Sequence, residues 1–351
     1  MSLPTSTKVI TLVENPTGVV TEKTFSLQTT PLEPLKENQV LLKHSVLSNG
    51  PAIRSWIDSA YDKARWGDLH VYAGQPVVTE IIAEVIASTS EQWPVGKYVK
   101  GLFPWAQYSV QSAEGLQPAI LIEGFSPWLS LSVFGFNGLT AYLAIFSELK
   151  LKKEDVVCVS SAAGSLGTLF VQLAAKVVGC TVIGIASGPK CEWVKSLGAK
   201  DCVDYKAPDF DARLSAALPG GCDVFFDNVG GAVLDAMIKH VKFYGRISVC
   251  GALSTYNHEP TVLQNWVEVV LARLNIKGEV TYQSALTTGY MVTDHFDKLP
   301  QAIEHLTQLV KDGTLQADAE EIVEAPIEDV AKLWISVFNN GPKGKFLTKL
   351  V

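Results

Sequence analysis

The middle of the chain alternates between two kinds of apolar pattern, and this alternation restricts its fold more than any other feature. Short apolar runs typical of strands are separated by stretches with apolar residues at helical spacing. The predicted strands are 156–160, 181–186, a short one near 203, 223–227 and 246–250, and the predicted helices between them are 165–178, 190–197, 210–218 and 231–240. Strands that alternate with helices indicate βαβ units, and therefore an α/β fold with a doubly wound parallel sheet covered on both faces.

The N-terminal part of the chain has a different character. From residue 8 to about 125, short Val- and Ile-rich runs such as 39–44, 77–86 and 97–103 are separated by Pro and Gly clusters. This pattern is typical of a β-rich domain with many turns. A helical pattern follows over 138–149, before the first strand of the alternating region.

The C-terminal part is mixed. It contains a predicted helix 299–311 that ends at Gly313, a strand near 321–324, a helix 327–338 and a final strand 345–351. These pieces lack a core of their own, so we expect them to complete the N-terminal domain. The predicted domains are therefore 1–130 with 300–351, and 131–299 as an insertion.

The bulk properties exclude several classes of function. A chain of 351 residues with a formal net charge of −7 has no basic footprint for nucleic acid or for a membrane surface. The first thirty residues lack the pattern of a secretory signal, and no apolar run approaches the roughly 20 residues that span a bilayer. We therefore expect a cytoplasmic protein whose partners are small molecules.

The strongest local motif joins the first predicted strand to the helix that follows it. The strand runs into a turn of small residues, Ala162-Ala163-Gly164-Ser165-Leu166-Gly167, and the helix then carries Gln172 and Lys176 on its polar side. Small residues let backbone N–H groups approach a pyrophosphate, and the helix directs its positive end at that charge. A tight turn without a ligand is the alternative, but two glycines and two alanines are more than packing requires. The turn predicts a Rossmann dinucleotide site.

The end of the second predicted strand indicates which dinucleotide binds. An acid at this position would hold the ribose 2′-hydroxyl of NAD, but the sequence has Ala186-Ser187-Gly188-Pro189-Lys190. Small residues leave room for a 2′-phosphate, and Lys190 offers a cation for it. Lys190 could instead be a solvated lysine in the first turn of a helix. The missing acid favours NADPH in either case.

Cysteine and histidine residues are arranged unfavourably for zinc. The six cysteines all lie between residues 158 and 250 and form no CxxC pair, so we interpret them as small buried side chains. The first 125 residues contain no cysteine and only two histidines, His44 and His70. A Cys₂His catalytic site in that domain is therefore excluded, and no metal site is predicted.

Four short sequence segments, taken together and in this order, resemble those of a known family. They are 137–142 (NGLTAY), the small-residue turn, 226–231 (FDNVGG) and 250–257 (CGALSTYN). Over most of the chain from about residue 130 it resembles the zinc-independent medium-chain dehydrogenase/reductase proteins of the alkenal/alkenone double-bond reductase branch. The resemblance implies a GroES-like catalytic domain beside the Rossmann domain, and an NADPH-dependent reductase. It also suggests a homodimer, by analogy alone.

The resemblance also implies roles for individual residues. The pyrophosphate would lie on 163–167, and the 2′-phosphate on Lys190 with Tyr205 near it. Asn228 would lie near the adenine or ribose, although it could simply be a turn former before Gly230. The stretch from Cys250 to Tyr256 would line the nicotinamide side, and the three residues Glu279, Val280 and Thr281 would pass close to the carboxamide.

Two positions depart from the family pattern. Ala52, in the stretch Pro51-Ala52-Ile53-Arg54, stands where the family often has a tyrosine two residues before an arginine. Pro342 stands where the family has an asparagine, ahead of Lys343-Gly344-Lys345. Both changes affect the expected substrate and leave the cofactor prediction unchanged.

The resemblance places Tyr256 at the centre of the expected chemistry. Hydride transfer to the β-carbon of an α,β-unsaturated ketone or aldehyde builds negative charge on the carbonyl oxygen, which a hydrogen-bond donor would stabilise. Tyr256 is the candidate donor, because it matches a family tyrosine beside the nicotinamide. It could instead bind only the nicotinamide ribose, or be an ordinary loop aromatic. Two other functions stay open: a zinc-free quinone or carbonyl reductase, and a non-catalytic NADPH-binding protein.

Overall fold

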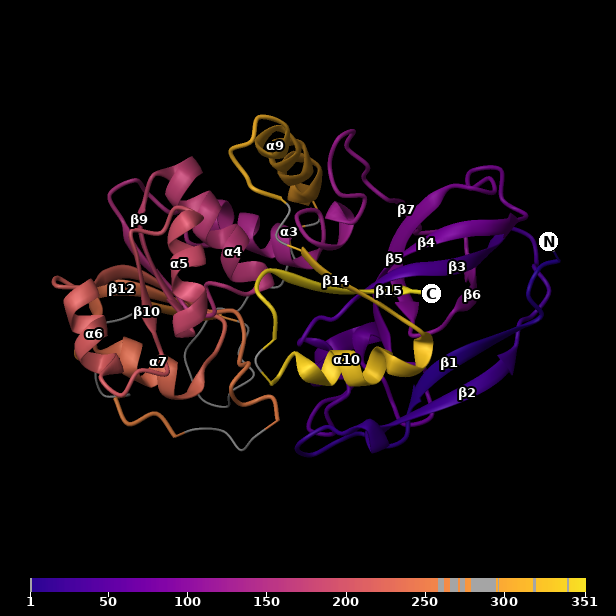
Figure 1. Ribbon diagram of the computed structural model, residues 1–351, viewed down its shortest axis with the longest axis horizontal. Coiled ribbons are helices and arrows are strands. Elements are labelled where there is room, and N and C mark those ends of the chain that lie inside the picture. The colour runs from indigo at the N-terminus through magenta and orange to yellow at the C-terminus, as the bar shows by residue number, and fades with distance from the viewer. Residues whose placement is uncertain are drawn as a thin grey trace. The chain divides into compact units, whose positions relative to one another are not determined.

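The chain forms two compact units in the computed structural model (Figure 1). The structure describes residues 2–257, 262–265, 271, 275–278, 295, 297–317, 320–339 and 341–351. The first unit consists of Met1–Leu131, Glu320–Pro342 and Phe346–Val351. The second consists of Ser132–Ala319 and Lys343–Lys345. Each unit is described separately below.

The second unit is built on a six-stranded parallel sheet. In spatial order its strands are β10 (Asp201–Asp204), β9 (Thr181–Ala186), β8 (Val156–Val159), β11 (Cys222–Asp227), β12 (Val241–Val249) and β13 (Asn275–Gly278). The chain starts at β8 and adds strands first on one side and then on the other. This order confirms the doubly wound sheet, and it adds β13, which the sequence patterns did not indicate.

Helices cover both faces of this sheet. They are α4 (Ser165–Gln172) with a π-helical continuation over Leu173–Val178, α5 (Gly188–Ser196), α6 (Phe210–Ala217) and α7 (Gly231–Ile238). Adjacent strand residues point to opposite faces. Phe225 of β11 packs in a buried cluster with Leu214 of α6 and Met237 of α7. Phe226 points the other way and stacks on Phe170 of α4 with 4.0 Å between ring centroids.

The second unit extends further along the chain than the sequence indicated. It includes α3 (Phe136–Leu143), which continues as a π-helix to Glu148, and also α9 (Leu299–Lys311), which we expected to belong with the N-terminal domain. Tyr142 of α3 explains this placement, because its hydroxyl lies 3.1 Å from Nδ1 of His305 on α9. Ala302, Leu306, Leu309 and Val310 of α9 are buried, and α9 belongs to the second unit rather than to the N-terminal one.

Gln172 also differs from the expectation. It was placed on the polar side of its helix, but its side chain is buried. Its Nε2 donates to the Gln316 carbonyl at 3.2 Å, and its Oε1 accepts from the Gln316 backbone N–H at 2.8 Å. The paired hydrogen bonds satisfy the buried amide and fasten the segment after α9 to α4.

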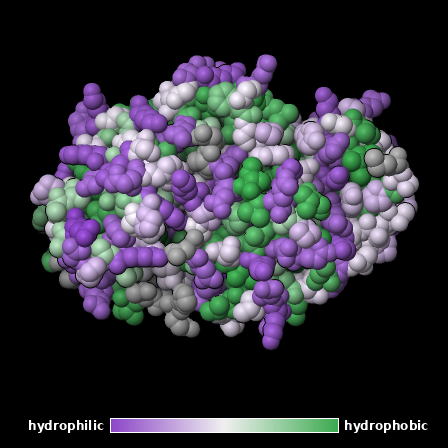
Figure 2. All heavy atoms as spheres, viewed as in Figure 1, coloured by the Kyte–Doolittle hydropathy of each residue, from purple (hydrophilic) through white to green (hydrophobic). Residues whose placement is uncertain are grey.

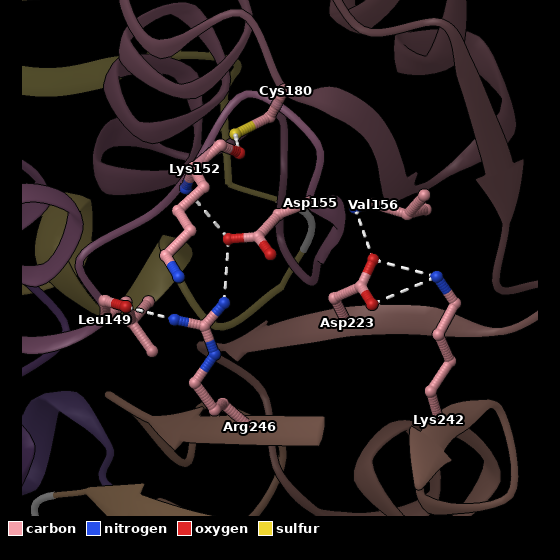
Figure 3. Close-up of polar contacts among 8 residues, drawn as sticks. All are labelled: Leu149, Lys152, Asp155, Val156, Cys180, Asp223, Lys242 and Arg246. Carbon is pink, nitrogen blue, oxygen red and sulfur yellow. Dashed lines mark hydrogen bonds and ion pairs between the residues drawn. The ribbon is translucent and has the colours of Figure 1, made fainter. Parts of the chain in front are cut away.

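Charged residues close the edge of the sheet where its strands begin (Figure 3). Asp155, just before β8, accepts from Arg246 of β12 at 2.7 Å, and the same guanidinium donates to the Leu149 carbonyl. Asp223 of β11 accepts from the Val156 N–H at 2.8 Å and from Lys242 of β12 at 2.9 Å. These contacts tie β8, β11 and β12 together at the edge opposite to the predicted cofactor site.

The first unit is β-rich. An antiparallel pair, β1 (Ser6–Leu12) and β2 (Phe25–Pro31), accompanies a seven-stranded sheet. The order in that sheet is β14 (Glu320–Ala325), β15 (Lys345–Leu350), β3 (Gln39–Ser48), β4 (Val78–Ser88), β5 (Tyr98–Pro104) and β7 (Gln117–Pro118), with β6 (Tyr108–Ser112) paired to β3. The helices of this unit are α1 (Ile53–Trp56), α2 (Lys63–Trp66) and α10 (Val330–Ser336).

Aromatic side chains join the two ends of the chain in the core of the first unit. Trp334 of α10 lies 5.7 Å from Trp105 and 5.8 Å from Phe25, measured between ring centroids, and Trp105 and Trp334 are buried. Residues 320–342 have no core of their own, and this shared cluster explains why they fold with the N-terminal strands.

His44 is a second buried feature of the first unit. It lies on β3, and its Nε2 is 2.8 Å from the Ser109 hydroxyl oxygen of β6. Burial lowers the pKa of its imidazole to about 4. The side chain is therefore neutral at ordinary pH, and it acts as a hydrogen-bonded core residue.

None of the described helices is long and apolar enough to cross a bilayer. On the face in Figure 2, hydrophilic residues interrupt the hydrophobic ones over both units.

Candidate dinucleotide site

Most predicted cofactor residues come together at one edge of the parallel sheet. Because its strands run in the same direction, the segments that follow β8, β9, β10, β11 and β12 all leave from the same edge. The strand order reverses between β8 and β11, and such a reversal opens a crevice at the carboxyl ends of the strands in doubly wound sheets. The small-residue turn follows β8, and Asn228 follows β11.

The turn after β8 is tightly folded. Ser161 adopts a positive φ of 49°, which directs the chain into α4. A Cβ atom on Gly167 would lie 2.2 Å from the Ser161 carbonyl oxygen and 2.8 Å from Cα of Ala162. Only glycine fits at this position, because helix α4 begins in direct contact with the backbone of the turn. Gly167, the last residue of the motif, therefore serves close helix–strand packing.

The start of α4 offers the groups that a pyrophosphate needs. Its N-cap residue, Gly164, provides no side-chain cap, and the first N–H groups of an α-helix have no acceptor within the helix. The Ser165 hydroxyl oxygen is buried and has no hydrogen-bond partner. An unsatisfied buried hydroxyl beside unsatisfied helix amides fits an anionic ligand with several acceptor oxygens. The residues present thus fit a dinucleotide phosphate.

A buried polar network behind the turn was not anticipated from the sequence. The Ser160 hydroxyl donates to Oδ1 of Asp227 at 2.6 Å and accepts from the Asn228 N–H at 2.7 Å. Asp227 also accepts from the N–H groups of Val229 at 3.0 Å and Gly230 at 2.9 Å. Complete burial raises the pKa of the Asp227 carboxyl to about 6, although these hydrogen bonds act in the opposite direction. The network fixes the loops after β8 and β11 relative to each other.

Lys190 and Tyr205 follow the neighbouring strands β9 and β10. Ala186 and Asp204 are paired at the ends of these strands, and the Tyr205 N–H donates to the Ala186 carbonyl at 3.2 Å. Lys190 lies in the first turn of α5, and 43% of Tyr205 is exposed. Both predicted 2′-phosphate residues therefore belong to the same corner of the sheet edge.

Asp204 is an acid in this corner that the sequence reasoning missed. Its Oδ2 lies 2.6 Å from the position that a Cβ atom on Gly188 would take, at the first residue of α5. The end of β9 lacks an acid, as predicted, but the adjacent strand β10 brings one close to it. A phosphate bound in this corner would therefore meet the Asp204 carboxylate as well as the Lys190 side chain.

The residues predicted on the nicotinamide side are only partly described. The Cys250 N–H donates to the Asp227 carbonyl at 2.7 Å, so the loop after β12 joins the buried network. Tyr256 lies in that loop and is half-buried. The Asn228 side chain donates to the Ser160 carbonyl at 2.8 Å, so it holds the end of β8. Glu279, Val280 and Thr281 lie outside the described residues.

A short C-terminal segment also reaches the phosphate turn. The Gly344 N–H donates to the Ala163 carbonyl at 2.9 Å, and Gly344 pairs with Gly164 in a parallel bridge. The Lys345 ammonium group, which is buried, donates to Oδ1 of Asn137 at 3.1 Å. We call residues 343–345 the C-terminal strap. Pro342, a departure from the family pattern, immediately precedes this strap.

The other departure, Ala52, lies at the start of α1 in the first unit. Arg54 of α1 is buried, pairs with Asp58 at 2.6 Å and donates to the Gly18 carbonyl at 2.9 Å. Its charge therefore holds α1 to these two neighbouring residues. Within the described residues, no three His, Cys, Asp or Glu side chains are grouped as a metal site requires.

The chain is similar to known oxidoreductases over most of its length. The family model for the N-terminal domain of oxidoreductases matches residues 8–119, and the one for zinc-binding dehydrogenases matches residues 165–306. Prostaglandin reductase 1 of Rattus norvegicus is 31% identical over 97% of this chain and 98% of its own length. The NADP(+)-dependent 2-alkenal reductase of Nicotiana tabacum is 30% identical over 89% of each chain.

A solved structure extends the likeness to the fold. CurA of Vibrio vulnificus in complex with NADPH matches 98% of this chain and 99% of its own, with a TM-score of 0.86 and 26% identity. The GroES-like and Rossmann folds expected of the two parts are thereby confirmed, as is NADPH as the cofactor. The chain therefore belongs to the zinc-independent alkenal/alkenone reductase branch of the medium-chain dehydrogenase/reductase family, and it is an NADPH-dependent oxidoreductase.

Proposed function

We propose that the protein uses NADPH to reduce the carbon–carbon double bond of an α,β-unsaturated ketone or aldehyde. The observation that carries this proposal is the 30% identity to a 2-alkenal reductase over 89% of both chains. The likeness to prostaglandin reductase 1 over nearly the whole chain supports a reductase. The folded phosphate turn, with its unsatisfied Ser165 hydroxyl, supports cofactor binding independently of these relatives.

The cofactor would be held along the carboxyl edge of the parallel sheet. We assign the pyrophosphate to Ala163, Gly164, Ser165, Leu166 and Gly167, whose amides open α4. The 2′-phosphate is assigned to Lys190 and Tyr205, and the adenine or its ribose to Asn228. The nicotinamide side is assigned to Cys250, Tyr256, Glu279, Val280 and Thr281. When bound, NADPH supplies the hydride for the reaction.

Tyr256 is the proposed hydrogen-bond donor to the substrate. Negative charge develops on the carbonyl oxygen as the β-carbon accepts hydride, and a phenol positioned there stabilises the enolate. A proton from a nearby acid then adds to the α-carbon and completes the reduction. The loop that carries Tyr256 begins at Cys250, whose backbone is fixed to Asp227. Tyr256 would therefore be positioned by the same buried network as the phosphate turn.

A matched substrate panel tests the proposal. Purified protein would be supplied with NADPH and one of three compounds: an enone, the saturated ketone of the same carbon skeleton, or a quinone. We expect NADPH oxidation with the enone and formation of the saturated ketone. Turnover of only the ketone or the quinone would contradict the proposal and identify a carbonyl or quinone reductase. Tight NADPH binding without turnover of any compound would identify a non-catalytic binding protein.

The same proposal includes an unsaturated carbonyl as the small-molecule partner and a cytoplasmic location. A homodimer stays a prediction from the family resemblance.

A further inference from the structure

The C-terminal strap places a lysine against the helix that carries Lys190. The Lys343 ammonium nitrogen lies 5.3 Å from the ring centroid of Trp193, within the range of a cation–π contact. Trp193 is half-buried on α5, whereas Lys343 is exposed. A contact of this kind at an exposed site is weak. Lys343 can therefore leave the ring when a stronger anionic partner is present.

The backbone contacts of the strap fix the position from which the Lys343 side chain extends. Gly344 donates to the Ala163 carbonyl and pairs with Gly164, so the next residue toward the N-terminus, Lys343, lies beside the phosphate turn. The residue after Gly344, Lys345, is held by its hydrogen bond to Asn137. Lys343 is thus the one exposed residue of a three-residue segment whose other two members are buried.

The side chain of Lys343 reaches α5 at Trp193, about one helical turn from Lys190. Trp193 follows Lys190 by three residues, and residues three apart lie on the same face of a helix. The lysine from the strap and the lysine from the first turn of α5 therefore belong to one neighbourhood, although they are 153 positions apart in the chain.

Acidic side chains near the start of α5 mean that a second cation would strengthen the binding of a 2′-phosphate there. The Asp204 carboxylate lies next to Gly188, and it would repel a 2′-phosphate bound at the start of α5. Glu192 of α5 is exposed and paired with Lys195 at 2.5 Å. A phosphate ester carries nearly two negative charges at neutral pH. Cations from both Lys190 and a second lysine would offset Asp204 and hold this charge.

We propose that Lys343 leaves Trp193 to bind the 2′-phosphate of NADPH together with Lys190. The inference rests on the cofactor site proposed above and adds a residue to it. Lys343 would thereby contribute to the choice of NADPH over NADH. Because Gly344 is bonded to the phosphate turn, the strap would hold this lysine in place at little further entropic cost.

Calorimetric titration of two variants tests the proposal. Lys343→Ala should weaken the binding of NADPH and of 2′,5′-ADP by roughly five- to tenfold, because a charge-assisted contact to phosphate is lost. Affinities for NADH and 5′-AMP, which lack the 2′-phosphate, should change less than about twofold. Lys343→Arg should retain most of the affinity for NADPH, because it keeps the charge. Lys153→Ala removes an exposed lysine before β8, at the opposite edge of the sheet, and should leave all four affinities unchanged.

Trp193 supplies a second measurement that does not depend on activity. In the wild type, 2′,5′-ADP should change the Trp193 fluorescence more than 5′-AMP does, and Trp193→Phe identifies the part of the signal that belongs to this residue. Lys343→Ala should abolish the difference between the two nucleotides. Equal losses of NADPH and NADH affinity in Lys343→Ala, or no loss of either, would overturn the assignment of Lys343 alone. A wild-type protein that bound neither dinucleotide would overturn the proposed site itself.

Discussion

The Ser160 hydroxyl donates a hydrogen bond of 2.6 Å to the Asp227 carboxylate, and this contact joins the carboxyl ends of the adjacent strands β8 and β11. Both residues are completely buried. The same carboxylate holds two backbone N–H groups of the loop after β11, and the Asp227 carbonyl holds the loop after β12. One buried acid therefore organises three segments that we assign to the cofactor.

Replacing this acid should loosen the sheet edge. Asp227→Asn puts an NH₂ group where one carboxylate oxygen accepts hydrogen bonds, so a buried donor loses its partner. We expect a loss of about 1–3 kcal/mol in the free energy of unfolding, measured with urea, together with weaker NADPH binding. The exposed acid Glu154 provides the control, because Glu154→Gln should change neither quantity. Wild-type stability in Asp227→Asn would show that the network contributes nothing to the fold.

The difference in stability between the wild type and Asp227→Asn should depend on pH. The pKa of Asp227 is raised from 3.8 to about 6 in the folded protein, so between about pH 4 and pH 6 the folded state binds more protons than the unfolded state. The stability of the wild type relative to Asp227→Asn should therefore fall as the pH rises through this window. Urea unfolding at several pH values measures this difference. A difference that grew with pH would mean that the hydrogen bonds outweigh burial.

His44 should make the stability of the first unit depend on pH in the opposite direction. Burial lowers its pKa from 6.5 to about 4, so between these values the unfolded chain binds the proton that the folded chain excludes. The stability of the first unit should therefore fall as the pH decreases from about 6.5 to 4. The His44 imidazole signals in an NMR titration should still be those of the neutral ring at pH 5. An imidazolium at that pH would contradict its burial as the dominant effect.

Gly167 tests the geometry of the phosphate turn. A methyl group at this position would lie 2.2 Å from the Ser161 carbonyl oxygen, and the obstruction is backbone. Gly167→Ala should therefore move the start of α4, lower the free energy of unfolding by about 1–3 kcal/mol and weaken NADPH binding. Gly220→Ala is the matched control in the same unit, since its Cβ would have no neighbour within 4 Å. Equal effects of the two substitutions would refute a specific role for the turn.

The alternating strand and helix patterns predicted most of the second unit because they are local. Apolar spacing over a few residues was enough to place β8, β9 and β11 and the helices between them. The same information could not assign α9 to a unit. Its apolar face was evident, but the surface that covers it depends on Tyr142 of α3, far away in the sequence.

The site contacts that the sequence did not reveal also join residues that are far apart in the chain. Ser160 and Asp227 are 67 positions apart, and neither belongs to a motif that indicates their contact. Asp204 approaches Gly188 only because β10 pairs with β9. The strap reaches Ala163 from the far end of the chain. A spacing rule describes residues within one element, whereas these contacts depend on which elements become neighbours.

Tyr256 tests the proposed chemistry apart from the binding of the cofactor. Tyr256→Phe keeps the ring and removes the hydroxyl, so turnover of an enone should fall by roughly 10²–10³-fold, as when an oxyanion donor is removed. The dissociation constant for NADPH should stay within about threefold of the wild type. Steady-state kinetics and calorimetry measure the two quantities separately. Undiminished turnover would rule out the donor role, and a large loss of NADPH affinity would indicate a ribose contact instead.

The position of the transferred hydrogen tests the central claim most directly. The protein would be incubated with an α,β-unsaturated ketone and NADPH deuterated at C4 of the nicotinamide, in separate reactions for the two faces of the ring. The product would then be examined by NMR. We predict that one of the two reactions places deuterium on the β-carbon of a saturated ketone whose carbonyl group is intact. Deuterium on the carbinol carbon of an unsaturated alcohol would contradict the account.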